Sequence, residues 1–237
     1  MNVNKLILSL VLMSTFFACT ESIDSKHTEV EKKPIQEEEE AVIEHKLVSA
    51  FEQQFSVFDL FKPNNGDIVN TLAQEKFELA LKKIKHYRSQ KAAALSETQK
   101  ANIRFMHIYA LAGLVSEKKK THQDLSKLLD SYKNKDLIVQ HFPITTGSPM
   151  SFNQIRVEQD KKDTIELSCV NQAGINIHCF VRAEVKGNLD LKKSVGKSAY
   201  LCGKLKDYKV SPSKVFSWIC DLKLSEGFIK ILEDEYR

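Results

Sequence analysis

The sequence predicts an α+β protein in which an N-terminal array of helical hairpins precedes a small, closed, five-stranded β-barrel. Two patterns support this prediction. Apolar residues recur at helical spacing over residues 42–131, whereas over residues 132–225 they alternate among strand-forming residues. The chain has 237 residues, 42% hydrophobic and 28% charged, so it can bury a core and has a globular composition.

A short apolar segment opens the chain. Residues 6–17 follow Lys5 and are too few for a bilayer-spanning helix, which needs roughly 20 residues, but they suit the apolar region of a signal peptide. They lead into Phe16-Phe17-Ala18-Cys19, which resembles the lipobox of bacterial lipoproteins. The resemblance implies cleavage after residue 18 and lipidation of Cys19, which would anchor the chain to a membrane. A plain signal peptide with a chance cysteine is the alternative.

The residue after the cysteine bears on the membrane in which the protein is expected to reside. Thr20 stands where, by analogy with enteric bacteria, an aspartate would retain a lipoprotein in the inner membrane. We therefore expect a lipid-anchored protein of the bacterial cell envelope, in the outer membrane and facing the periplasm or the cell surface.

An acidic segment follows the cysteine. Residues 20–45 contain nine acidic and three basic residues and few large apolar ones, so they cannot bury enough surface to offset the entropy of ordering. We assign residues 19–41 to a flexible tether. Residues 46–237 contain 31 basic and 22 acidic residues, a net charge of +9. This charge either attracts phosphate-rich partners or only keeps the protein soluble.

Four helices are predicted in residues 42–131. The first carries Phe51, Phe55 and Phe58 and ends in a turn over residues 61–66, and Asp67 caps the second, whose apolar stripe runs to Tyr87. A capping box of Ser96 and Gln99 opens the third helix, which is apolar almost all round and is therefore expected to be the central buried one. Thr121 begins the fourth.

The remaining residues show strand patterns. Strands are predicted at residues 137–142, 152–157, 164–170, 174–181, 198–205 and 215–224. A short helix over residues 189–195 ends at Gly196. Strands, a short helix and two further strands suggest a barrel of the OB type. Residues 226–237 are predicted to form a tail with a short helix.

Four stretches of this part carry a family resemblance: residues 132–139, residues 177–180, residues 191–204 and residues 218–222. They include Tyr132-Lys-Asn-Lys135 at the opening, Ile177-His-Cys-Phe180 in a later strand, and Tyr200-Leu-Cys-Gly203 within the third stretch. Together they resemble the tRNA_anti-like OB domain. The resemblance implies a fold far more than a function. A position outside the cytoplasm argues against nucleic acid as a partner.

Four cysteines lie in the β part, and an even number in an exported domain favours disulfides. The third and fifth strands of an OB barrel are neighbours, so the OB prediction implies Cys179–Cys220 first and Cys169–Cys202 as the remainder. A zinc site with His178 is one alternative, although no C-x-x-C spacing is present. Reduced cysteines packed in the core are the other.

Motifs for nucleophilic, nucleotide-dependent or zinc-dependent catalysis are absent from the sequence. We therefore expect no enzyme activity, no cofactor and no metal. The first functional hypothesis is a non-catalytic scaffolding or interaction module with a protein partner in the envelope. The alternative is an OB-fold module that binds an oligosaccharide, an oligonucleotide or another anionic ligand through aromatic and basic residues. The candidate binding residues are Arg156, Arg182, Tyr200, Lys204, Lys206 and Trp218.

Overall fold

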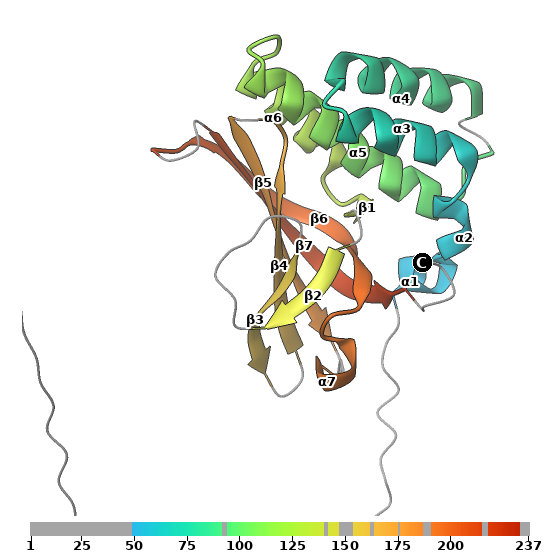
Figure 1. The fold of residues 1–237 in the computed structure, drawn as a ribbon, viewed down its shortest axis with the longest axis vertical. Helices are drawn as coiled ribbons and strands as arrows, with labels where there is room; N and C mark the ends of the chain where they lie inside the picture. Colours follow the sequence, from blue (N-terminus) through green and yellow to red (C-terminus); the bar gives the residue numbers. More distant parts are fainter. Residues whose placement is uncertain are drawn as a thin grey trace, which may run out of the picture. The chain divides into compact units, whose positions relative to one another are not determined.

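The computed structural model describes residues 49–91, 94–139, 142–146, 154–161, 164–174, 176–186, 191–214 and 218–232. The chain divides into two units, residues 1–43 and 44–237, and all described residues belong to the second. The predicted signal peptide, Cys19 and the tether lie outside the described residues. The second unit is α+β: helices come first and are followed by the strands of one mixed sheet (Figure 1).

Six helices precede the sheet. Their bounds are α1 Ala50–Gln54, α2 Val57–Leu60, α3 Pro63–Ala73, α4 Phe77–Lys91, α5 Glu97–Ser116 and α6 His122–Tyr132.

The first predicted helix is divided into α1 and α2. The chain breaks at Ser56, whose backbone N–H donates to Thr98 Oγ1 at 3.0 Å instead of continuing the helical ladder. The predicted turn over residues 61–66 is present only at Phe61 and Lys62, because Pro63 is the first residue of α3 and Lys62, not Asp67, is its N-cap. Proline suits this first position because it lacks an N–H that would need a partner.

The second predicted helix is divided as well. Glu75 has a φ of 55°, in the left-handed region, and the chain turns there between α3 and α4. The two capping boxes hold the later helices: Ser96 with Gln99 opens α5 as predicted, and Thr121 with Asp124 opens α6.

Helix α5 is the centre of the helical part, as predicted. It contacts the other five helices as well as strands β1 and β5. Most of its residues are buried, including polar ones near its start such as Thr98 and Asn102. A helix apolar on nearly all sides needs such a position, since no face of it can meet water at low cost.

Seven strands follow. Their bounds are β1 Asp136–Ile138, β2 Phe142–Thr146, β3 Ile155–Lys161, β4 Thr164–Gln172, β5 Ile177–Lys186, β6 Ser198–Pro212 and β7 Trp218–Ile231, with α7 Leu191–Ser194 between β5 and β6.

The strands pair in the order β1-β6-β2-β3-β4-β5-β7, and an additional pairing of β6 with β7 closes a ring. Strands β3, β4 and β5 form an antiparallel meander, whereas β5 and β7 are parallel, with Cys179 opposite Cys220. The long strand β6 pairs with β1, β2 and β7. Gly196, with a φ of 83°, lies in the turn between α7 and β6, as expected for a residue just past a short helix.

Two predictions in the β part need correction. A short helix was predicted in residues 226–237, but residues 226–231 continue strand β7 and pair with the first half of β6. Phe228 opposes Cys202 and Ile231 opposes Ala199, so this end of β7 contributes to the β6–β7 pairing that closes the ring. The predicted strand over residues 137–142 is divided between β1 and β2.

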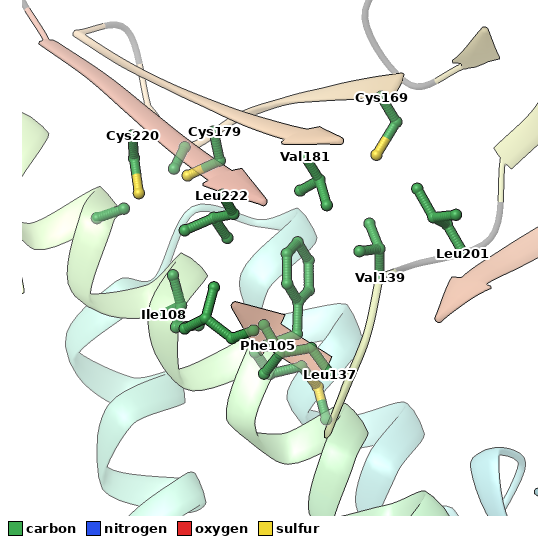
Figure 2. Packing of buried hydrophobic residues seen from close by; sticks show 14 of the residues in the cluster. Phe105, Ile108, Leu137, Val139, Cys169, Cys179, Val181, Leu201, Cys220 and Leu222 are labelled. Carbon is green, nitrogen blue, oxygen red and sulfur yellow. The ribbon is translucent and has the colours of Figure 1, made fainter. Parts of the chain in front are cut away.

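Helices and strands share one hydrophobic core. Phe105 projects from α5 toward Val139, which follows β1, and toward Val181 of β5 and Leu222 of β7 (Figure 2). A second, smaller cluster includes Phe51 of α1, Cys202 and Tyr200 of β6 and Phe228 of β7. The described helices include none that is both long and apolar enough to cross a membrane.

Candidate functional site

Three of the four basic candidate residues form ion pairs on the sheet. Arg182 Nη2 lies 2.7 Å from an Asp221 carboxylate oxygen, and Lys204 Nζ lies 2.7 Å from Glu226 Oε1. Arg156 Nη2 lies 3.5 Å from Glu158 Oε2. The fourth candidate, Lys206, is exposed.

The structure brings Arg182 and Lys206 together. They line a groove of about 290 Å³ over β5, β6 and β7, joined by a third cation, Lys223. Two carboxylates, Glu166 and Glu184, line the same groove. Its charge is therefore mixed, with three cations beside two carboxylates.

Tyr200 lies away from this groove. Its ring is 7% exposed and packs against Phe55 with centroids 6.3 Å apart. Burial raises the pKa of Tyr200 to about 12. The side chain connects β6 to the segment after α1, so its role is packing and not the stacking of a ligand.

Trp218 also packs against the helices. Its indole stacks on the imidazole of His122 at the start of α6, with ring centroids 4.5 Å apart and planes 18° apart. The side chain is half-buried against the main core. The six predicted residues therefore do not form one site: Arg182 and Lys206 share a groove, while Tyr200 and Trp218 join the sheet to the helices.

The four cysteines of the β part are buried, free thiols in the structure. Cys179 and Cys220 are direct partners on the parallel strands β5 and β7 (Figure 2). The neighbouring Cys179 thiol and burial raise the pKa of Cys220 well above its usual range. A bridge between these two stays a prediction.

The other predicted disulfide, Cys169–Cys202, joins residues that lie in different hydrophobic clusters. Cys169 on β4 belongs to the main core, whereas Cys202 on β6 belongs to the smaller cluster with Phe51 and Phe228. Their strands β4 and β6 are not neighbours. A Cys169–Cys202 bridge would therefore require β6 to turn its other face to the core.

The described residues contain no group of three or more His, Cys, Asp or Glu side chains placed to hold a metal ion. Burial raises the pKa of Cys169 to about 12 and that of Cys202 well above its usual range. Both stay protonated at neutral pH and are poor nucleophiles and poor metal ligands in this state.

A larger cavity, of about 480 Å³, lies between α4 and α5 and was not predicted from the sequence. Lys85 and Arg88 line it from α4, and Lys100 and Arg104 line it from α5. Each pair is separated by three or four positions, which places both members on the same face of a helix. This spacing was the available signal, but similar cations on other helices are simply solvated.

Comparisons with protein families, with curated proteins and with solved structures found no match to this chain.

Proposed function

We propose that this chain is a lipid-anchored, non-catalytic protein of the bacterial cell envelope, and that its folded unit is an interaction or scaffolding module. The observation that carries the second part is the placement of Trp218 and Tyr200. A module that binds sugar or nucleotide chains displays its aromatic side chains to solvent. Here both residues join the sheet to the helices.

The proposed anchor rests on the Phe16-Phe17-Ala18-Cys19 segment and the apolar residues before it. Acyl chains at Cys19 would hold the protein on the membrane, because each buried CH₂ contributes about 0.8 kcal/mol. The acidic residues 19–41 would then space the folded unit from an anionic lipid surface, since like charges repel.

We also propose that the ring of strands is an OB-type barrel and that α3–α6 form a helical hairpin array. The strand connections support the first proposal. The meander β3-β4-β5 is followed by the short helix α7 and the β6–β7 pair, and β7 lies beside β5, as the third and fifth strands of an OB barrel do. Strands β1 and β2 are additional to a five-stranded barrel.

Site-specific photo-crosslinking tests the interaction role. A photoreactive phenylalanine analogue is placed at Leu79 of α4 or at Val195 after α7. Both positions can accommodate an aromatic side chain because they are more than 40% exposed. We expect one of these faces to crosslink the same envelope protein in repeated experiments, while the other serves as the internal control. A scan of exposed positions over α4, α6 and β6 that yields no reproducible crosslink would contradict the proposal.

The groove of Arg182, Lys206 and Lys223 supports a second candidate function, the binding of an anionic chain to the sheet. Titration with acidic oligosaccharides and single-stranded DNA at low salt tests it. If this function is correct, Lys206→Gln/Lys223→Gln weakens binding, whereas Lys127→Gln/Lys135→Gln, which removes the same charge elsewhere, does not. Absence of binding by the unaltered chain would exclude this candidate.

A further inference from the structure

The cavity between α4 and α5 has a basic lining with an apolar side. Lys85 and Arg88 contribute from α4, and Lys100 and Arg104 from the first half of α5. Two aliphatic residues, Leu95 and Ile103, form the apolar part of the lining. The volume of about 480 Å³ is in the range of small-molecule sites.

Hydrogen bonds behind the cavity fix the position of Arg88. Its Nη1 donates to Tyr132 Oη at 3.0 Å, and that hydroxyl lies 2.8 Å from His107 Nδ1. Arg104 is fixed in a similar way, because its Nη1 donates to the backbone carbonyl of Asp136 at 2.9 Å. Each guanidinium has five N–H groups, so most of its donors stay available to a ligand.

The positive charge of the cavity is poorly balanced by acidic groups. In the described part of the chain, Lys100 has an ion-pair partner in Glu97 at 2.8 Å, while Lys85, Arg88 and Arg104 have no carboxylate at ion-pair distance. The basic residues of the sheet groove differ, since Arg182 there is paired with Asp221.

Two titratable groups, His107 and Asp136, lie beside this charge. Burial, and then the positive charges of Arg88 and Lys85, lower the pKa of His107 to about 4, so its imidazole is neutral at physiological pH. Asp136 lies beside Arg104 on the strand side, and its carboxylate offsets part of the positive charge. Burial raises the pKa of its carboxyl, although Lys204 and Arg104 oppose that shift.

From this arrangement we propose that the cavity binds a phosphate monoester whose organic part is apolar. The planar guanidinium groups of Arg88 and Arg104 suit the oxygens of a phosphate, and Lys85 and Lys100 add charge that a dianion neutralises better than a single carboxylate. The organic part would lie against the small area that Leu95 and Ile103, which are 8% and 2% exposed, present to the cavity. A free phosphate ester and a phosphatidate headgroup share this chemistry.

Isothermal titration of the full chain in a non-ionic detergent tests the proposal. The probes are butyl phosphate, inorganic phosphate, butyrate and dibutyryl phosphatidate, which are all water-soluble. The test variant is Lys85→Gln/Lys100→Gln, because neither lysine donates to another secondary-structure element. The control is Lys127→Gln/Lys209→Gln, which removes the same charge from exposed positions on α6 and β6.

We expect butyl phosphate to bind more tightly than inorganic phosphate and than butyrate. The test variant should lose about tenfold or more in affinity, the control should keep it, and both should retain the unaltered unfolding midpoint. If dibutyryl phosphatidate binds as well, the natural ligand can be a lipid headgroup. If butyl phosphate binds and dibutyryl phosphatidate does not, the ligand is a free phosphate ester. Failure of butyl phosphate to bind, or equal losses in both variants, would overturn the proposal. Neither result would bear on the photo-crosslinking.

Discussion

Trp218 at the start of β7 stacks on His122 at the start of α6, and this contact joins the sheet to the last helix of the helical part. The rings are nearly parallel, with planes 18° apart. Trp218 is the only tryptophan of the chain, so its fluorescence reports on this junction alone.

Replacing His122 by alanine is expected to lower the free energy of unfolding by about 1 kcal/mol, because a stacked ring pair contributes about 0.5–1.5 kcal/mol beyond its buried area. The tryptophan emission maximum should shift as the indole loses its cover. Urea unfolding followed by circular dichroism measures the first effect and fluorescence the second. His86→Ala is the matched control, since His86 is exposed on α4. Identical spectra and stabilities in the two variants would refute the junction.

Gly113 of α5 should not tolerate alanine. A Cβ atom there would lie 2.3 Å from the ring of Phe77, which is 2% exposed and has no room to move aside. We expect Gly113→Ala to lower the free energy of unfolding by about 1–3 kcal/mol, even though alanine is the better helix former. Gly66→Ala in α3 meets no atom within 4 Å and should instead raise it by about 0.5–1 kcal/mol. Urea unfolding of both variants compares the signs, and a stabilising Gly113→Ala would contradict the packing of α4 on α5.

His107 is expected to make stability depend on pH. Its pKa is about 4 in the folded chain and about 6.5 when unfolded, so the unfolded chain binds the extra proton between these values. The stabilising contribution is complete above pH 6.5, falls as the pH drops toward 4, and is lost below that. It amounts to about 3 kcal/mol at most.

The measurement is the difference in unfolding free energy between the unaltered chain and His107→Gln from pH 7.5 to pH 4. The difference cancels the titration of the carboxylates that both chains share. A difference that stays constant over this range would show that His107 titrates normally in the folded chain.

The exported chain is expected to carry one disulfide, between Cys179 and Cys220, and two thiols, Cys169 and Cys202. Direct partners on adjacent strands are close enough for a bridge, whereas Cys169 and Cys202 lie on separate strands in different clusters. Peptide mapping of the chain from the envelope under non-reducing conditions checks this, after alkylation of free thiols in denaturant. A peptide linking Cys169 to Cys202 would contradict the ring topology.

Local signals in the sequence were enough to predict much of the helical part. The capping boxes at Ser96 and Thr121 mark helix starts through hydrogen bonds between residues three apart, and such bonds need no tertiary context. The break at Ser56 was missed because its cause is not local, and the break at Glu75 was missed because a left-handed residue there is usually a glycine. The Ser56 N–H bonds to Thr98, which lies 42 residues away.

The sheet was harder to predict for the same reason. The strand pattern of β4 and β5 and the short helix before Gly196 are visible in the sequence, but the continuation of β7 to Ile231 depends on its pairing with β6. Of the candidate binding residues, Arg182 and Lys206 could be selected from the sequence because they are basic. That Tyr200 and Trp218 face the helices depends on packing between elements far apart in the chain.

The most direct test of the proposed anchored module is the mass of its N-terminal peptide, isolated from bacteria that express the full chain. We predict a peptide that begins at Cys19 and carries a diacylglyceryl group on its sulfur and an acyl chain on its amino group. A peptide that begins at any other residue, or that carries Cys19 without lipid, would contradict the account.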